Sequence, residues 1–512
     1  SQAPATAAPA QSAELYKEGF WHRRLGELAA LAIVAIFGAT LHAFWTGANG
    51  GVDQNGYLVG GKRMALTGTT KLAPRDPYTK EVDSFQFVGL MWVGIDLGTE
   101  TERYYPKYPI GLPALVAAAL YLGGPGHGVI LTYCINPISM ALAVLGTFFL
   151  ARTVCGSLGG LLASVFMATS PITLGLSNNP SSHATTAALV TWGMFLLLRW
   201  WQLGGAWRAA GAGLFLGYAY TIRYTEGLLI LPILVALALS FRPRRLRYWI
   251  EAGLLCAWWL IPVLILTIFN LKAMGSWTGY DPTGESTGFK LANLIGDAEF
   301  AGNWETLLRQ FNATGLYFVF PLAVMGLLWI CTWNWRVGLL WCAWILPNCF
   351  IYLIYYWAPD GNGTGYLRFF HSIFPALATT AAWMLIRIAR LVAGTRRHRA
   401  KPLPLRLGRA VVVFLLLAVP TAFTILINLR SGLLLLESEQ HSGLFLQKTL
   451  MQIEGLRGDI IPANSVVFSH DQILHHLQLV KDYELYTPQV FQERLLRERV
   501  SMDLTDDPHP LH

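Results

Sequence analysis

Residues 23–57 read RRLGELAALAIVAIFGATLHAFWTGANGGVDQNGY: a basic start, a long apolar run and a glycine-rich segment with a single acid. The apolar run, about 26 to 46, has the roughly 20 residues that a helix needs to cross the hydrocarbon core of a bilayer. It is too long for the core of a signal peptide and has no small-residue cleavage site, so we expect a retained anchor. The stretch predicts a membrane helix followed by a loop that carries chemistry.

The same apolar pattern recurs along most of the chain. Hydrophobic residues make up 54% of the 512 positions and charged residues 13%, about half the charge share of a soluble domain. Such a chain needs an apolar solvent, which the bilayer supplies. We therefore predict an all-α polytopic membrane protein with about eleven crossings. The predicted spans are approximately 26–46, 129–151, 157–174, 184–201, 209–222, 226–241, 249–270, 314–332, 337–357, 372–389 and 410–429.

The formal net charge of +8 reports topology rather than nucleic-acid binding, because the basic residues form short runs between apolar spans. With Arg23 and Arg24 in the cytoplasm, every later cytoplasmic connection carries positive charge, as the positive-inside rule requires. These basic positions are Arg152, Arg199 with Arg208, the run 241–247, Arg336 and the run 396–409. All six cysteines lie in or beside apolar spans without a CxxC pair, so no disulfide framework, zinc site or catalytic thiol is expected.

The spans divide the chain into three parts. Residues 1–24 predict a disordered cytoplasmic tail, 25–429 the transmembrane module, and 430–512 a small extracytoplasmic C-terminal region with an apolar β-like run. The first outer loop, 47–128, is expected to carry juxtamembrane helices. Within it, LPALVAAALYL at 112–122 is about half the length of a crossing and is closed by GGPGHG, which favours a helix lying at the outer interface.

The acid of the first loop is the leading catalytic candidate. Asp53 lies among glycines and precedes Tyr57 by about one helical turn. Glycines allow close approach of a substrate, and a carboxylate beside such a route can act as general base for a hydroxyl. The alternative is that Asp53 is a helix N-cap.

Cations recur at the predicted outer ends of the spans. Lys107, near Arg103, lies among tyrosines and prolines before the interfacial helix, and Arg368 with His371 lies at the mouth of the tenth span. Such cations can hold a phosphate oxygen. For Lys107 alone, the alternative is a snorkelling anchor without a substrate. Several cations arriving from distant parts of the chain favour an anionic headgroup ligand.

Two further candidates lie between these segments. His183, in the polar second outer loop, either hydrogen-bonds a substrate or is a loop histidine with no task. Arg223 and Glu226 lie near the outer ends of two spans, where charges are costly unless they are paired or functional. Their i, i+3 spacing also allows a mutual ion pair, which is compatible with a phosphate-binding Arg223.

These residues, in this order, resemble the membrane-embedded glycosyltransferases of the protein O-mannosyltransferase and aminoarabinose-transferase type, which have the GT-C fold and include glycosyltransferase family 39. The resemblance covers roughly residues 25–390. It rests on ordered features rather than one strict motif. These are Asp53 after the first span, YPKYPIGLP before the interfacial helix, Ser170-Pro171 at the end of the third span, Arg223, and YLRFFHSIFPAL late in the chain.

The resemblance implies a single-displacement, inverting transfer of a sugar from a polyprenyl-phosphate donor to an acceptor protein, lipid or glycan on the extracytoplasmic side. Asp53 would take the acceptor proton. Lys107, Arg223 and Arg368 would neutralise the departing phosphate. Tyr57, His183 and Glu226 would line the substrate pocket.

Two departures from the pattern bear on metals. Many relatives follow the first acid with another, whereas Gln54 follows Asp53 here, and the second outer loop has Asn178, Asn179 and His183 in place of an acid. We therefore expect no metal and no cofactor, because the lipid-linked donor is itself a substrate. The expected partners are that donor, membrane lipids and the acceptor. The expected location is a plasma membrane, such as a bacterial inner membrane.

Two rival functions share the polytopic architecture. A flippase or transporter of lipid-linked sugars would also bind anionic lipid, although transporters usually place ionisable residues at mid-membrane on broken helices. A non-catalytic scaffold subunit is the other alternative. The gathering of charges at outer ends and loops favours a one-sided enzyme.

Overall fold

The computed structural model describes residues 18–48, 51–71, 86–87, 92–95, 103–106, 108–279, 288–296, 302–311, 318–355, 364–393, 403–455, 466–468, 479 and 484–487. Its long helices are α1 (Phe20–Ala43), α2 (Val52–Thr67), α4 (Gly111–Thr169), α6 (Ser182–Leu203), α7 (Ala206–Ile222), α8 (Ile230–Ser240), α9 (Leu246–Met274), α12 (Val319–Trp333), α13 (Trp335–Leu353), α15 (Phe374–Ala393) and α16 (Leu403–Gly455). The short helices are α5 (Pro171–Ser177), η1 (Tyr224–Leu229), α10 (Ala292–Ile295), α11 (Asn303–Gln310), α14 (Thr364–Leu367) and η4 (Arg368–Ile373).

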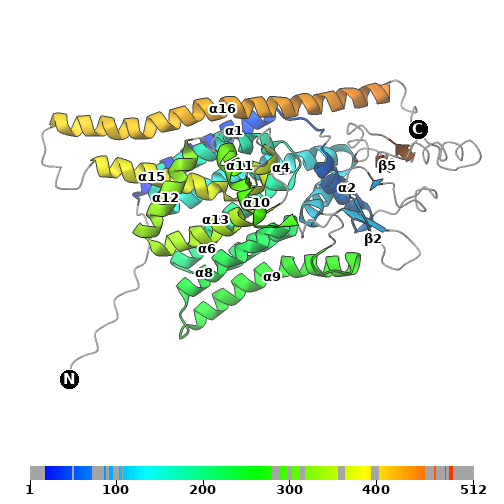
Figure 1. Ribbon diagram of the computed structural model, residues 1–512, viewed down its shortest axis with the longest axis horizontal. Coiled ribbons are helices and arrows are strands. Elements are labelled where there is room, and N and C mark those ends of the chain that lie inside the picture. The colour runs from blue at the N-terminus through cyan, green and yellow to red at the C-terminus, as the bar shows by residue number, and fades with distance from the viewer. Residues whose placement is uncertain are drawn as a thin grey trace, which may run out of the picture.

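The helices form an elongated bundle, with the small strands gathered at one of its ends (Figure 1). Each of the eleven predicted apolar spans overlaps at least one helix. By length and hydropathy, six helices of the described chain are candidate membrane spans, and η1 with α8, and α12, are shorter apolar helices. The prediction of an all-α polytopic fold is confirmed, whereas the number of crossings stays a prediction.

Two glycines divide α4 into three helical pieces. Gly124 (φ 57°, ψ −164°) and Gly156 (φ 87°, ψ 176°) have backbone angles that residues with a Cβ atom rarely adopt. The break at Gly124 ends the first piece of α4, which includes the predicted interfacial helix 112–122. The turn at Gly156 separates the second and third predicted spans. The GGPGHG motif therefore ends a short helix, as the sequence indicates.

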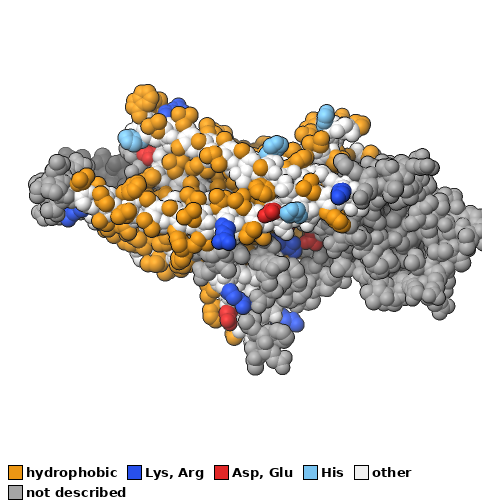
Figure 2. Space-filling model, turned by 90° about the horizontal axis from the view of Figure 1, so that it is seen from above, with side chains coloured by type: hydrophobic (Ala, Val, Ile, Leu, Met, Phe, Trp, Pro, Cys, Tyr) orange, Lys and Arg blue, Asp and Glu red, His pale blue; other side chains and the backbone are white. Residues whose placement is uncertain are grey.

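The surface of the bundle is apolar. In the apolar 18-residue stretch of α16 only 6% of the residues are buried, and in that of α9 22% are. In the stretch that includes α15, 94% of the residues are buried. Figure 2 shows one face on which hydrophobic side chains cover most of the described surface. Lipid tails are the solvent that such a surface requires. α15 is thus the central helix, and α9 and α16 lie at the periphery.

Small residues allow α15 to lie close to its neighbours. Ala378, Ala381 and Ala382 are fully buried, and a Cβ atom at Gly326 of α12 would lie 2.2 Å from the backbone oxygen of Thr380. Close backbone approach through small residues is the usual means of helix packing in membranes.

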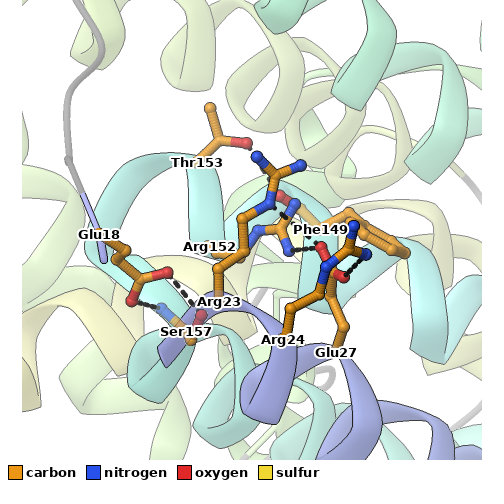
Figure 3. Close-up of polar contacts among 8 residues, drawn as sticks. All are labelled: Glu18, Arg23, Arg24, Glu27, Phe149, Arg152, Thr153 and Ser157. Atoms are coloured by element: carbon orange, nitrogen blue, oxygen red, sulfur yellow. Dashed lines mark hydrogen bonds and ion pairs between the residues drawn. The ribbon is translucent and has the colours of Figure 1, made fainter. Parts of the chain in front are cut away.

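An ion network joins the start of α1 to α4 (Figure 3), at the end of the bundle opposite the strands (Figure 1). Glu27 of α1 pairs with Arg152 of α4 at 2.7 Å, and with Arg23 and Arg24 of its own helix at 3.2 and 3.0 Å. The Ser157 backbone N–H and hydroxyl both donate to Glu18. Arg23, Arg24 and Arg152, which the sequence assigns to one side of the membrane, therefore lie together around Glu27.

Two glycines of α2 pack it against the start of α4. A Cβ atom at Gly61 would lie 2.3 Å from Val116 and 2.9 Å from the Pro113 backbone oxygen, and one at Gly60 would lie 3.1 Å from Pro106. From the sequence, we interpreted the glycines of this segment as allowing a substrate to approach. Gly60 and Gly61 are required by close packing of α2.

Residues of the first loop and of the C-terminal region form one small sheet. β1 (Gln86–Phe87) pairs antiparallel with β5 (Glu484–Thr487), which pairs in parallel with β4 (Val466–Phe468). A separate hairpin joins β2 (Trp92–Ile95) and β3 (Arg103–Pro106). The β-like run near the C-terminus thus contains a strand. The boundary expected at residue 430 lies inside α16, which continues to Gly455.

Candidate active site

An ion pair between Asp53 and Arg368 lies at the centre of the candidate site. Asp53 belongs to the first turn of α2, and Arg368 begins η4, more than 300 positions later in the sequence. An Arg368 guanidinium nitrogen and the Asp53 Oδ2 are 3.2 Å apart, and the side chains keep 23% and 34% of their surface exposed. The acid and one of the predicted cations are therefore adjacent and remain accessible.

Asp53 is not an N-cap. Gly51 is the N-cap residue of α2, without a side-chain cap, and Asp53 lies two positions inside the helix. A carboxylate there interacts favourably with the positive end of the helix dipole. Its side chain is left free to face Arg368 and the Tyr108 hydroxyl, with which it is hydrogen-bonded.

Tyr57 lies one turn further along α2 and is packed rather than open. Its ring stacks on that of Tyr108, with centroids 4.6 Å apart, and only 3% of its surface is exposed. Its hydroxyl is hydrogen-bonded to Ser182 at the start of α6. Burial raises the pKa of the Tyr57 hydroxyl well above its usual value, and the charge of Asp53 adds to the rise. Tyr57 therefore stays neutral and ties α2 to α6.

Arg223 is held by groups from two other helices. It lies in extended conformation between α7 and η1, and its backbone N–H donates to the Ala219 oxygen of α7 at 3.0 Å. Its guanidinium contacts His183 Nδ1 and donates to the Tyr352 hydroxyl at 2.5 Å. Thr225 is also hydrogen-bonded to that hydroxyl, at 2.6 Å. His183 is a buried residue of α6 that contacts Arg223, which neither of the two alternatives described, and its hydrogen bond to a substrate stays a prediction.

One aromatic ring lies against both arginines. The Phe369 centroid is 5.7 Å from the Arg223 guanidinium carbon and 5.3 Å from that of Arg368, within cation–π range. Tyr352 stacks on the same ring at 5.1 Å. Phe369 therefore fixes two cations on one aromatic platform, in spite of their mutual repulsion.

Glu226 is completely buried near Arg223 but makes no hydrogen bond with it. Among the described residues, neither carboxylate oxygen of Glu226 has a hydrogen-bond partner. The alternative of a closed Arg223–Glu226 ion pair is therefore wrong, because η1 is a 3₁₀ helix that starts after an extended Arg223. Glu226 acts on Arg223 only through its charge.

The remaining predictions concern a lysine and metals. Lys107 lies outside the described residues, so its placement is not part of the site geometry. Within the described part of the chain, no group of three or more His, Cys, Asp or Glu side chains could hold a metal ion. The expectation that no metal is needed stays a prediction.

Sequence reasoning did not single out Tyr108, Tyr352 and Phe369. Two of them lie beside a candidate that the sequence does identify: Tyr108 follows Lys107, and Phe369 follows Arg368. Tyr352 lies next to the last residue of α13, in a run of aromatic residues that looks like an ordinary interfacial belt. Only their contacts with the charged groups distinguish them.

Comparisons with known proteins agree with this architecture. The sequence profile described as dolichyl-phosphate-mannose-protein mannosyltransferase matches residues 107–266. ArnT from Cupriavidus metallidurans, solved with undecaprenyl phosphate, superposes with a TM-score of 0.55 at 13% identity, over 94% of this chain and 89% of that one. The chain has the GT-C fold.

Two archaeal structures share the GT-C fold with lower coverage of their own length. The oligosaccharyltransferase of Archaeoglobus fulgidus in the apo form gives a TM-score of 0.56 at 13% identity, over 93% of this chain and 65% of that one. Archaeal oligosaccharyltransferase AglB from the same organism, in complex with an inhibitory peptide and a dolichol-phosphate, gives 0.50 at 12% identity, over 91% and 64%. No curated protein matches the chain by sequence.

Proposed function

We propose that this protein is a glycosyltransferase that moves a sugar from a polyprenyl-phosphate donor to an acceptor hydroxyl on the extracytoplasmic side of the membrane. The observation that carries the proposal is the Asp53–Arg368 ion pair, with Arg223 on the same aromatic platform. A carboxylate beside two fixed cations suits a reaction in which a proton is removed and a phosphate departs. The lipid phosphates named with the ArnT and AglB structures support the donor class.

Asp53 acts as the general base of a single displacement. Its carboxylate takes the proton of the acceptor hydroxyl as that oxygen forms a bond to the anomeric carbon. The bond from this carbon to the phosphate oxygen breaks, and the phosphate leaves with the electron pair as the polyprenyl phosphate. Attack from the face opposite the leaving group inverts the anomeric configuration.

Arg223 and Arg368, with Lys107, neutralise the charge that develops on the departing phosphate. Preorganised cations contribute most in a site where they need not rearrange during the reaction. The contacts of Arg223 with His183, Tyr352 and Phe369 support this role, because they fix the guanidinium before the substrate arrives. Arg368 bridges the two halves of the site, since it contacts both Asp53 and Phe369.

The test separates binding from chemistry. In Asp53→Asn, we expect sugar transfer from a panel of undecaprenyl-phosphate sugars to fall by about a thousandfold or more, as for loss of an essential base. The affinity for undecaprenyl phosphate should change by less than about threefold, whereas Arg223→Ala should weaken it by about tenfold or more. Transfer by Asp53→Asn at the wild-type rate would overturn the proposal, and so would a wild-type protein that moves no sugar but flips the lipid.

A further inference from the structure

α16, the last long helix of the chain, contacts residues beside the candidate active site. Gln440 of α16 donates to the backbone oxygen of Ala43, at the end of α1, at 3.0 Å. A Cβ atom at Gly443 would lie 2.1 Å from the Thr46 Oγ1, and one at Gly432 would lie 2.3 Å from Leu174 of α5. Residues 432–443 of α16 are therefore packed against the ends of α1 and α5 that border the candidate site.

A chain of polar side chains runs from this part of α16 to the first turn of α2. The half-buried Glu439 carboxylate lies beside the Asn179 side chain. The Asn179 Oδ1 accepts a hydrogen bond from the Gln54 Nε2 at 2.7 Å. Because a carboxylate only accepts, Asn179 has to turn its amide N–H toward Glu439 and its carbonyl toward Gln54. The direction of the whole chain is thus set by the charge of Glu439.

The middle of this chain is anchored independently of its ends. The backbone oxygen of Asn179 accepts from the Asn136 Nδ2, which also donates to Ser181 at 2.7 Å. The neighbouring Asn178 donates to the backbone oxygen of Leu41 at 3.0 Å. Asn179 is therefore a fixed point to which α2 can be attached.

Gln54 passes this restraint directly to the catalytic turn. It follows Asp53 in sequence, is 8% exposed, and folds back over Gly51, where a Cβ atom would overlap its Oε1. Its amide therefore connects the N-cap position of α2 with Asn179. A glutamate at position 54 lacks the N–H that this arrangement uses.

We propose that Glu439, Asn179 and Gln54 are positioning residues that hold the first turn of α2, and with it Asp53, in place for the reaction. The inference rests on the proposed function and adds to it a role for the C-terminal helix. The resemblance leads one to expect a second acid at position 54. The inference accounts for Gln54 there, because the position needs a side-chain N–H that donates to the Asn179 Oδ1.

The test exchanges the hydrogen-bond donor and acceptor on the two sides of Asn179. Glu439→Ala and Gln54→Glu should each lower kcat for the undecaprenyl-phosphate sugar that the wild type uses by about tenfold or more, because small displacements of a catalytic group are costly. The KM for that donor should change by less than about twofold. Glu439→Gln keeps an acceptor for Asn179 and should retain most activity. In Gln54→Glu with Glu439→Gln, Asn179 can turn over and bond both partners, so kcat should recover.

The control is Glu437→Ala, since Glu437 is exposed on the same helix two residues away. It should leave kcat unchanged. An equal loss in Glu437→Ala and Glu439→Ala would overturn the proposal. A double variant no more active than Gln54→Glu alone would overturn it as well.

A second readout keeps this inference separate from the proposed function. Hydrogen–deuterium exchange of the amides of residues 51–58, in protein reconstituted in lipid nanodiscs, should rise in Glu439→Ala and in Gln54→Glu and return to the wild-type level in the double variant. Unchanged exchange in Glu439→Ala would refute the positioning role even if wild-type transfer is observed. If the wild type transfers no sugar, these exchange rates still decide whether the chain holds α2.

Discussion

At the scale of single residues, the site combines groups that are weak signals on their own. Asp53 is the only acid of residues 47–57, and arginines at helix ends are common in membrane proteins. Their meaning comes from proximity: Asp53 pairs with Arg368, and Phe369 lies against both Arg368 and Arg223. A carboxylate and two cations within one aromatic frame form a site that can accept a proton and bind an anion.

Tyr57→Phe tests the packing role of that hydroxyl. Loss of its hydrogen bond to Ser182 should cost about 1 kcal/mol of stability and lower activity by less than about tenfold. Because burial raises the Tyr57 pKa, the hydroxyl keeps its proton from pH 6 to pH 9. The ratio of variant to wild-type kcat should therefore be constant over that range, as measured in a pH series. A ratio that changes with pH in either direction would show that Tyr57 itself titrates during turnover.

At the scale of elements, special backbone positions and close packing place the groups of the candidate site. α2 lies against the first piece of α4 through Gly60 and Gly61, and α16 is packed across the end of α1 through Gly443. The positive-φ turns at Gly124 and Gly156 divide α4 into three helical pieces. The candidate site is therefore formed by the ends of helices, and these helices are packed against one another.

Gly156→Ala tests the turn inside α4. At φ 87° and ψ 176°, a Cβ atom should cost about 1–3 kcal/mol, because this region is almost restricted to glycine. The matched control is Gly253→Ala in the middle of α9, where a Cβ atom meets nothing within 4 Å; it should be neutral or slightly stabilising. Thermal unfolding in detergent micelles measures both. A Gly156→Ala protein as stable as Gly253→Ala would contradict the assigned turn.

At the scale of the whole molecule, two ends of one bundle carry different charges and tasks. One end holds Glu18, Glu27 and Arg152 in a closed network in which charge satisfies charge (Figure 3). The other end holds Asp53, Arg223 and Arg368, of which Asp53 and Arg368 remain partly exposed. This division suits the proposed one-sided enzyme, because the ion pairs at one end are structural and the Asp53–Arg368 pair at the other is accessible.

The orientation of the bundle is a prediction at this scale. Reporter fusions in a bacterial host, made after Arg244 and after Thr278, place a reporter at opposite ends of α9. The basic run 241–247 predicts that fluorescent protein fused at Arg244 is bright and alkaline phosphatase there inactive, with the reverse at Thr278. The opposite result at both positions would place Asp53 in the cytoplasm and exclude the proposed donor geometry.

Much of the fold could be predicted because a membrane restricts the structures that an apolar segment can adopt. Apolar runs of crossing length have few alternatives to helix in lipid, so the eleven predicted spans all overlap helices. The continuation of α16 to Gly455 was not predicted, because the sequence beyond residue 429 is more polar and its hydropathy resembles that of a tail. In this part of α16, contacts with the ends of α1 and α5 take the place of contacts with lipid.

The sequence by itself determined the helical membrane fold and the identities of Asp53, Arg223 and Arg368 as unusual charges. It could do so because hydropathy and charge act locally along the chain. Tertiary structure alone decided that Asp53 pairs with Arg368, that Tyr352 and Phe369 fix the arginines, and that Glu439 reaches Asn179. Those contacts join segments up to several hundred residues apart, and only the packing of whole helices determines which of their ends meet.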